Sequence, residues 1–320
     1  MSELRVTEPL PLDAPIHIAG HRGLVGGALW RHLAERGHTA LLGRASGELD
    51  LRVRDAVFDF YKESRPEYVI LAAARVGGIL ANSTYPADFL SDNLRIQTNV
   101  LDAAAQFGVR RLLFLGSSCI YPRDCPQPIK EEYLLTGPVE KTNDAYAIAK
   151  IAGVIHVQAL RRQLGCSFIS AMPTNLYGPG DNYDLETSHV LPAMIRKFHE
   201  AKAKSEPTVT LWGSGTPRRE FLYADDLASA CVTLLERYDD AMPINVGAGT
   251  DIAIRDLGAL VAKTVGYQGS ISWDLSKPDG TPQKLLDVAR LERLAWKASV
   301  SLSQGIALAY ESYRSCAGAA

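Results

Sequence analysis

The sequence predicts an α/β protein built on a doubly wound parallel sheet, with a second, smaller domain of mixed α/β structure. Three observations lead to this fold class. A short apolar strand runs directly into a glycine-rich turn and a helix near the start of the chain. Apolar strands and amphipathic helices then alternate up to about residue 180. The length of 320 residues is also large for one simple domain.

The glycine-rich turn follows the apolar strand Ile16–Ala19 and leads into a helix expected over residues 27–36. It reads Gly20-His21-Arg22-Gly23-Leu24-Val25-Gly26, with the spacing G-x-x-G-x-x-G. Glycines let a backbone turn tightly and approach a pyrophosphate, which then lies at the positive end of the helix. All residues of this turn are therefore predicted to bind a dinucleotide cofactor. The alternative is a tight turn that binds nothing.

The residues after the second predicted strand, over residues 39–42, indicate which dinucleotide is bound. NAD enzymes usually have an acidic residue here that binds the ribose 2′-hydroxyl, whereas arginine favours the 2′-phosphate of NADP. This chain has Arg44, together with Arg22 in the turn, and no acidic residue before Glu48. The cofactor is therefore predicted to be NADP(H). The alternative role of Arg44 is an uncommitted charge on a surface loop.

Further strands and helices continue the alternation. Asp50-Leu51 is expected to close a third strand beside the adenine. The elements expected after it are helix 56–65, strand 68–74, helix 87–107, strand 111–115, helix 143–163, strand 167–172, helix 190–203, helix 225–237 and strand 244–247. Such sheets bind ligands in the crevice at the carboxyl ends of their strands. The loop Gly116–Pro122 lies at one of these ends and is a candidate site of chemistry.

Three side chains that can reach this crevice could act together on a carbonyl group. Tyr146 and Lys150 lie four residues apart in a predicted helix, so they share one face, one turn apart. The lysine ammonium is expected to lower the pKa of the tyrosine, which is about 10 in water. Ser117 can hold the substrate oxygen against Tyr146. The three are predicted to be catalytic in hydride transfer; the alternative is a surface helix with a tyrosine at its base.

Composition excludes several classes of partner. The chain has 34 Lys and Arg against 36 Asp and Glu, so nothing points to nucleic acid or to an anionic membrane surface. No apolar run reaches the ~18 residues that span a bilayer. The 5 cysteines are scattered without metal-site spacing, which favours a cytoplasmic protein and gives no metal-binding motif.

The domain boundaries follow from these elements. We expect a disordered N-terminal arm over residues 1–14, a Rossmann domain over residues 15–180, and a smaller substrate domain over residues 181–320. The second boundary is approximate, because the segment 221–250 is expected to return to the large domain through the strand 244–247.

Several further stretches between residue 20 and about residue 290 resemble one group of extended short-chain dehydrogenase/reductases, the GDP-L-fucose synthase family. Beyond the glycine turn and the Y-x-x-x-K pair, they are Val76–Ile79, Thr84–Phe89, Gly116–Pro122, Pro173–Pro179, Ser188–Val190, Trp212–Pro217 and Lys277–Pro282. The family epimerises a GDP-sugar at the two carbons beside a 4-keto group and reduces the ketone with NADPH.

This resemblance implies roles for two residues in the epimerisation. Cys119 is implied as the base and His189 as the acid, and both side chains can exchange protons near neutral pH. From the residues alone, the favoured interpretation is that Cys119 is a small buried loop residue and His189 a residue at a helix start.

The resemblance also implies the ligand contacts. Beyond the glycine turn and Arg44, cofactor contacts are implied at Asp50, Leu51, Leu115, Gly116, Lys150, Pro173, Thr174, Asn175, Leu176 and His189. Contacts to the GDP-sugar are implied at Lys197, Trp212, Arg219 and Asp279. A solvated charge at Lys197 and core packing of Trp212 are the alternatives. A homodimer that pairs the helices 87–107 and 143–163 across a two-fold axis is implied as well.

This chain departs from the family at two positions. Lys197 stands where some relatives have arginine, which keeps the charge but loses the fork geometry. Ser46 stands where some relatives have a further basic residue near the 2′-phosphate.

Two other kinds of function stay open. A nucleotide-sugar 4-epimerase or 4,6-dehydratase of the same family would recycle bound NAD within one turnover, and the dehydratases have an acidic pair where this chain has Ser118-Cys119. A protein of another class, an NADP-sensing Rossmann protein without catalysis, would need the glycine turn but not Ser117, Tyr146 and Lys150.

Overall fold

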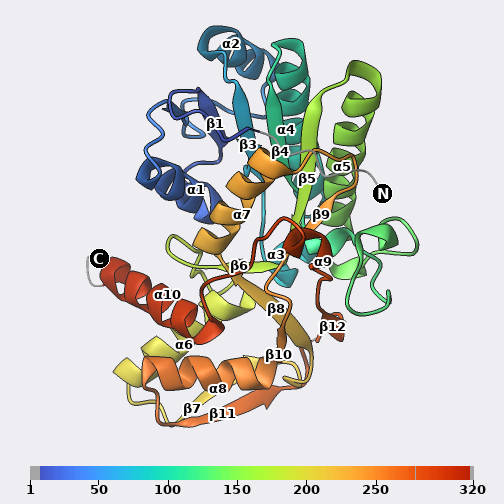
Figure 1. Ribbon diagram of the computed structural model, residues 1–320. Coiled ribbons are helices and arrows are strands. Elements are labelled where there is room, and N and C mark those ends of the chain that lie inside the picture. Colours follow the sequence, from blue (N-terminus) through green and yellow to red (C-terminus); the bar gives the residue numbers. More distant parts are fainter. Residues whose placement is uncertain (1–7, 278, 318–320) are drawn as a thin grey trace.

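The computed structural model describes residues 8–277 and 279–317. Figure 1 shows two bodies, one above the other. The upper body is a parallel sheet with helices on both faces, and the lower body carries α6 (Val190–Ala203), α8 (Ile254–Val265) and α10 (Leu302–Ala317) with several short strands.

Parallel strands form the large sheet, in the order β2-β1-β3-β4-β5-β9. Their bounds are Ile16–Ala19 for β1, Leu41–Leu42 for β2, Tyr68–Leu71 for β3, Arg111–Leu115 for β4, Ser167–Pro173 for β5 and Ile244–Val246 for β9. The strand order reverses beside β1, which is the doubly wound arrangement. Every residue of β1, β3 and β4 is buried, as expected for strands covered on both faces. The predicted fold class is confirmed.

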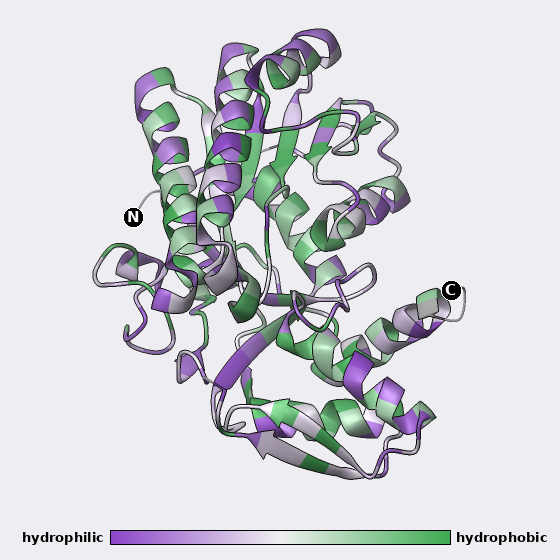
Figure 2. Cartoon of the chain, turned by 180° about the vertical axis from the view of Figure 1, so that it is seen from behind, coloured by the Kyte–Doolittle hydropathy of each residue, from purple (hydrophilic) through white to green (hydrophobic). Residues whose placement is uncertain are grey.

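Helices cover both faces of this sheet and enclose two apolar cores. α1 (Leu24–Glu35) and α7 (Ala224–Arg237) pack on one face, and α2 (Arg54–Ser64), α4 (Pro86–Gln106) and α5 (Asp144–Leu164) pack on the other. In Figure 2 the strands are apolar and the outer helix faces carry the hydrophilic residues. Burial of the apolar faces of the helices therefore holds the large body together.

The smaller body is organised around β8, which pairs with three other strands. These strands are β8 (Arg218–Tyr223), β6 (Asn175–Tyr177), β10 (Asp251–Ala253) and β12 (Gln283–Lys284), beside a separate pair of β7 (Thr208–Trp212) and β11 (Ser270–Asp274). The short helices are α3 (Ile79–Thr84), η1 (Ser118–Ile120), η2 (Glu131–Tyr133), η3 (Lys141–Asn143) and α9 (Ala289–Glu292). Because only Thr174 separates β6 from β5, the two bodies meet at the carboxyl end of the large sheet.

The expected third strand and the expected N-terminal arm need correction. Asp50-Leu51 does not close a strand, because Leu51 lies in a turn that Asp50 stabilises by accepting a hydrogen bond from the backbone N–H of Arg52 at 2.9 Å. Of the arm expected over residues 1–14, residues 1–7 lie outside the described residues. Residues 8–14 are not a disordered arm, since Leu10 and Ala14 are buried in the apolar core.

Other expected elements are found. α6 and β4 have the predicted bounds, and the strand predicted to return to the large sheet is β9, which pairs with β5.

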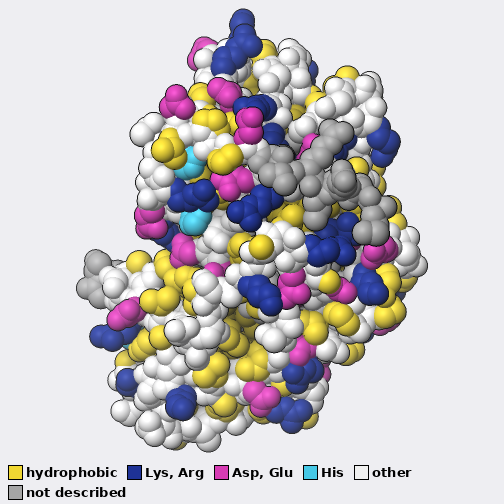
Figure 3. All heavy atoms as spheres, in the orientation of Figure 1, with side chains coloured by type: hydrophobic (Ala, Val, Ile, Leu, Met, Phe, Trp, Pro, Cys, Tyr) yellow, Lys and Arg dark blue, Asp and Glu magenta, His cyan; other side chains and the backbone are white. Residues whose placement is uncertain are grey.

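Charged side chains are mixed over the face drawn in Figure 3, with Lys and Arg beside Asp and Glu on both bodies. This distribution agrees with the formal net charge of −2. Among the described residues, no helix combines the length and the apolar character that crossing a membrane requires.

Candidate active site

A cleft of about 790 Å³ opens at the carboxyl ends of the strands, where α/β sheets bind ligands. The predicted cofactor and catalytic residues that line it are Gly20, Gly23, Leu24, Val25, Gly26, Arg44, Asp50, Leu51, Leu115, Gly116, Ser117, Tyr146, Lys150, Pro173, Thr174, Asn175, Leu176 and His189. His21, Arg22 and Cys119 do not line it. Segments from distant parts of the chain therefore converge on one space.

The glycine turn leaves the room that a bound pyrophosphate needs. Gly20 has a φ of +89°, and a Cβ on this residue would lie 2.8 Å from the backbone nitrogen of Ala73. A Cβ on Gly26 would lie 2.0 Å from the Gly20 carbonyl oxygen. No side chain caps the first turn of α1, so its backbone N–H groups are available to an anion. These residues fit a dinucleotide.

Two basic residues, His21 and Arg44, follow β1 and β2, where the adenosine part of the cofactor is predicted to bind. Their surroundings differ. Arg44 lines the cleft and its Nη1 donates to the Gly43 carbonyl at 2.9 Å. The His21 ring packs on Gly43 and on Trp30, and its Nδ1 is buried without a hydrogen-bond partner among the described residues. Burial lowers the pKa of His21, with help from neighbouring arginines. The exposed guanidinium of Arg44 is therefore available to an anionic group in the cleft, whereas the His21 ring is packed beside it.

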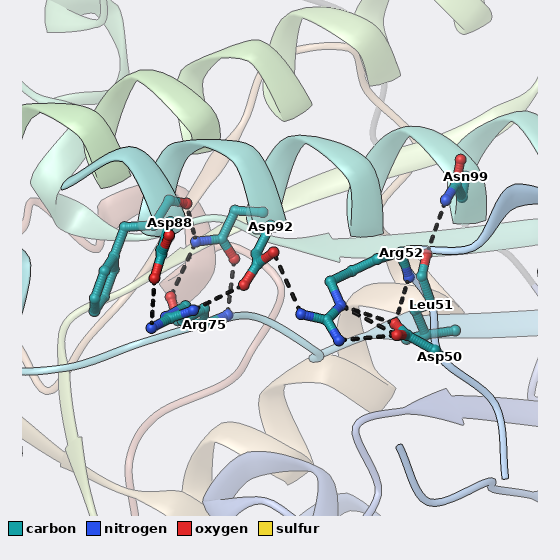
Figure 4. Close-up of polar contacts among 9 residues, drawn as sticks. Asp50, Leu51, Arg52, Arg75, Asp88, Asp92 and Asn99 are labelled. Carbon is teal, nitrogen blue, oxygen red and sulfur yellow. Dashed lines mark hydrogen bonds and ion pairs between the residues drawn. The ribbon is translucent and has the colours of Figure 1, made fainter. Parts of the chain in front are cut away.

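An ion-pair network runs from the adenosine end along α4 (Figure 4). Arg52 donates to Asp50 at 2.8 Å and lies 3.5 Å from Asp92. The other carboxylate oxygen of Asp92 accepts from Arg75 at 2.9 Å, and Arg75 also lies 3.1 Å from Asp88. Asp92 therefore holds two arginines that come from different loops of the cleft.

The contacts of Arg75 continue to Tyr146. Asn93 accepts a hydrogen bond from the backbone N–H of Arg75 at 2.9 Å and donates one to its carbonyl at 3.0 Å. The guanidinium of Arg75 lies 5.6 Å from the centroid of the Phe89 ring. Phe89 meets the Tyr146 ring edge-on, with 6.4 Å between centroids. α4 thus supports both the loop of Arg75 and Tyr146.

Ser117, Tyr146 and Lys150 meet in the cleft as predicted, but the lysine has another partner. Its ammonium donates to the Leu115 carbonyl at 2.8 Å and lies 5.9 Å from the centroid of the Tyr146 ring. Ser117 lies beside Tyr146 and favours its ionised form, which lowers the pKa of the tyrosine. The Ser117 hydroxyl also accepts from the backbone N–H of Cys119 at 3.3 Å. The serine therefore links the tyrosine to the cysteine.

Burial reverses the pKa shift expected for Tyr146. Desolvation raises its pKa well above the usual 10.0, the neighbouring Cys119 adds to the rise, and the hydrogen bond with Ser117 opposes it. Burial also lowers the pKa of Lys150 from 10.5 to about 8. The expectation that the ammonium lowers the pKa of Tyr146 is therefore wrong in this structure, because desolvation outweighs a charge that is directed at Leu115.

Cys119 and His189 belong to different elements of the structure, η1 and the start of α6. Cys119 is buried in η1, and burial raises the pKa of its thiol, while Lys284, Ser117 and Lys150 lower it. His189 stands at the start of α6, at the surface of the cleft. Desolvation lowers the pKa of its imidazole, although the residue as a whole is exposed.

Residues implied as GDP-sugar contacts lie outside the cleft, on the smaller body. Trp212 is 49% exposed, and the ammonium groups of Lys197 and Lys277 lie 5.8 and 5.4 Å from the centroid of its ring. Arg219 on β8 interacts electrostatically with Asp279. The exposure of Trp212 excludes the alternative that it is a core residue. Aromatic, cationic and acidic groups are thus together at one edge of the smaller body.

Two residues at the site were missed from the sequence. Lys284 lies in β12 beside Arg219, and its charge reaches Cys119. Asp181 lines the cleft, with one carboxylate oxygen buried without a partner among the described residues, and burial raises its pKa to about 7. Lys284 lies two residues after Lys277–Pro282, one of the stretches that resemble the family. Extending the comparison beyond Pro282 could have found it.

Comparison with known proteins shows the family of this chain. The sequence matches the NAD dependent epimerase/dehydratase family over residues 16–247. It is 55% identical over 301 residues to GDP-L-fucose synthase 1 of Arabidopsis thaliana, covering 94% of this chain and 93% of the relative.

Two solved structures share the fold over nearly the whole chain. A GDP-L-fucose synthetase from Naegleria fowleri bound to NADP has a TM-score of 0.91 and 28% identity, covering 99% of both chains. A GDP-6-OMe-4-keto-L-xylo-heptose reductase from Campylobacter jejuni has a TM-score of 0.91 and 35% identity, covering 96% of this chain and 99% of that chain. The chain therefore belongs to the NAD dependent epimerase/dehydratase family, in which it groups with the GDP-L-fucose synthases.

Proposed function

We propose that this protein converts GDP-4-keto-6-deoxy-D-mannose to GDP-L-fucose, by epimerisation at carbons 3 and 5 of the sugar and reduction of its 4-keto group. The position of Ser117 carries the proposal. Its hydroxyl interacts with Tyr146 and accepts from the backbone N–H of Cys119, so one side chain links the proposed proton donor to the sugar oxygen with the proposed base at the neighbouring carbons. Relatives named GDP-L-fucose synthase, 51–55% identical, support the same activity.

The cofactor of this reaction is NADP(H), which supplies the hydride for the ketone when bound. The glycine turn holds its pyrophosphate, Arg44 its 2′-phosphate, and Thr174 and Asn175 its nicotinamide side. These two residues are firmly placed, since their side chains donate to the Glu220 carbonyl at 3.2 and 2.7 Å. The Naegleria fowleri relative bound to NADP supports this assignment.

Cys119 and His189 perform the epimerisation. The 4-keto group makes the neighbouring C–H bonds acidic, because the enolate left by proton loss is stabilised. The Cys119 thiolate removes the proton from one face of the carbon, and the His189 imidazolium gives a proton to the other face. Both groups then exchange protons with solvent before the second carbon is inverted.

Tyr146 supplies the proton for the reduction. Its raised pKa keeps the hydroxyl protonated near neutral pH, as an acid acting in the reducing direction must be. Ser117 holds the substrate oxygen while Tyr146 donates to it. Lys150 fixes the base of the tyrosine helix to β4 through the Leu115 carbonyl.

The decisive experiment supplies GDP-4-keto-6-deoxy-D-mannose and NADPH in deuterated water. We expect NADPH oxidation and deuterium at both carbons beside the original ketone. Reduction without deuterium at these carbons would show that the protein is a 4-reductase without epimerase activity. A reductase is the kind of activity named for the Campylobacter jejuni relative. Conversion without net NADPH consumption would favour a 4-epimerase or a 4,6-dehydratase, and NADPH binding without turnover would favour an NADP sensor.

A homodimer and a cytoplasmic location belong to the same proposal. Ile148 and Ile155 on α5 are 49% and 38% exposed and share one face, which a second copy would cover. The cysteines are free thiols, as in a reducing compartment. Light scattering should report a dimer, and Ile155→Glu should give monomers; a monomeric parent protein would refute this interface.

A further inference from the structure

We infer that Gly78 is a positioning residue for the epimerisation: its backbone holds the segment 181–188 by direct contact and so fixes the position of His189 at the cleft. The inference rests on the proposed role of His189 as the acid. It assigns a function to a glycine that lies outside the turn of residues 20–26.

Backbone atoms of two segments distant in sequence meet at Gly78. Its N–H donates to the Thr187 carbonyl at 3.0 Å, so the loop after β3 is hydrogen-bonded to the segment that precedes α6. Gly77, Thr187, Ser188 and His189 all line the cleft. This contact of Gly78 with residues 187 and 188, which we call the clasp, therefore joins the two bodies beside the cleft.

The clasp leaves no room for a side chain at residue 78. A Cβ on Gly78 would lie 2.7 Å from the Ser188 carbonyl oxygen, which is a backbone atom. The φ of Gly78 is −67° and its ψ is −178°, an extended conformation that any residue can adopt. Glycine is therefore needed here because Ser188 approaches so closely, and not because of its own backbone conformation.

Hydrogen bonds from Asn82 hold the loop after β3 in place. Asn82 is 6% exposed, and its side-chain amide donates to the carbonyls of Gly77 and Gly78 at 2.8 and 3.0 Å. The backbone N–H of Asn82 also donates to the Gly78 carbonyl, at 3.1 Å. The side of the clasp that carries Gly78 is therefore fixed.

Asp184 organises the other side of the clasp. Its Oδ1 accepts from the backbone N–H groups of Glu186 and Thr187 at 3.1 and 3.0 Å, and from the Thr187 hydroxyl at 2.9 Å. The Asp184 carbonyl accepts from the backbone N–H of Ser188 at 2.9 Å. Asp184 is exposed and is not among the described residues that line the cleft. Its influence on the cleft therefore passes through residues 187 and 188.

The clasp acts on His189 because Ser188 is the preceding residue in the chain. His189 is the N-cap residue of α6, and its carbonyl accepts from the backbone N–H of Ala193 at 3.1 Å. Among the described residues, its imidazole makes no capping hydrogen bond with the helix. The position of the ring therefore depends on its backbone, which the clasp holds on one side and α6 on the other.

The first test measures deuterium exchange at the sugar carbons. In Gly78→Ala, the Ser188 oxygen has to move from 2.7 Å to the 3.4 Å at which ordinary contacts begin. A displacement of 1 Å can cost about 10²-fold in rate, so this smaller shift should slow exchange about tenfold. Parental exchange in Gly78→Ala would overturn the inference.

Two changes at Asp184 test the clasp from its other side. Asp184→Ala should also slow exchange, whereas Asp184→Asn keeps the acceptor oxygen and should restore most of the rate. The matched control is Gly47→Ala, since its φ lies outside the left-handed region and a Cβ there meets no atom of residues 8–277 and 279–317 within 4 Å. Equal rates in Asp184→Ala and the parent protein would overturn the inference.

The second test asks whether Gly78 acts through His189. Gly78→Ala combined with His189→Ala should exchange no more slowly than His189→Ala alone, because a positioning residue has no effect once the group that it positions is gone. A double variant that shows the product of the two single losses would overturn the inference. Parental exchange in His189→Ala would instead refute the proposed acid.

The third test does not depend on activity. Among the 7 histidines of the chain, the ring signals of His189 are identified in the NMR spectrum by their loss in His189→Ala. They should shift in Gly78→Ala and Asp184→Ala and stay in place in Gly47→Ala. Unshifted His189 signals in both clasp variants would overturn the inference and leave the proposed function standing.

Discussion

Replacing Asp92 with asparagine tests whether the ion-pair network of α4 prepares the cleft for its cofactor. The carboxylate holds Arg52, in the turn that follows Asp50, and Arg75, in the loop that follows β3. Asparagine keeps the shape of the side chain but removes its charge. Both loops should then become more mobile, and cofactor binding must restrict them again.

The expected magnitude follows from the exposure of these groups. Asp92 is 15% exposed, whereas Arg52 and Arg75 are 47% and 38% exposed. Partly exposed ion pairs contribute about 0.2–1 kcal/mol each. Loss of both pairs should therefore cost about 1 kcal/mol, which raises the Kd for NADPH about fivefold.

The assay is a fluorescence titration with NADPH at low and high salt. Asp88→Asn is the matched control. Within residues 8–277 and 279–317, the ion pair of Asp88 is with Arg75 alone, at 3.1 Å, so this change should alter Kd less than about twofold. Adding Arg52→Gln to Asp92→Asn should cost less than the sum of the single changes. The reasoning is refuted if Asp92→Asn binds NADPH like the parent protein, or if Asp88→Asn weakens binding equally.

Three further predictions concern the cleft. Tyr146→Phe should lower the rate of ketone reduction about 10²–10⁴-fold while label exchange continues, and equal loss of both would contradict separate acid–base groups. The pKa of Lys150 falls from 10.5 to about 8 on folding, so the unfolded chain binds more protons between these values and stability rises with pH there. Lys150→Met should lack that gain of up to about 3 kcal/mol in denaturant melts, and unchanged pH dependence would refute the account. Gly26→Ala places a Cβ 2.0 Å from the Gly20 carbonyl oxygen and should abolish NADPH binding in the fluorescence titration. Normal binding would show that the backbone of the turn can move to accommodate a side chain.

Elements defined by local periodicity could be predicted from the sequence. α6 and β4 have the expected bounds because their apolar spacing coincides with burial. The second strand was expected over residues 39–42 but spans Leu41–Leu42, since the backbone N–H of Thr39 donates to Leu12 instead. That contact depends on where the N-terminal segment packs, which local pattern does not indicate.

The same distinction applies to the candidate site. Ser117, Tyr146 and Gly20 lie in short stretches at strand or helix ends, where residue type and spacing are informative. Lys284 reaches the site only because β12 pairs with a strand distant in sequence. The pKa of Tyr146 depends on how tightly the surrounding segments exclude water, so the sequence suggested the wrong direction.

Completion of the large sheet by β9 has a consequence for how the chain can be divided. A fragment of residues 15–180 would leave β5 as an open edge, and such edges recruit strands from other molecules. It would also lack α7, which covers one face of the sheet. Newly made chain therefore cannot close its first core until most of the second half has left the ribosome, and the two bodies should express well only as one polypeptide.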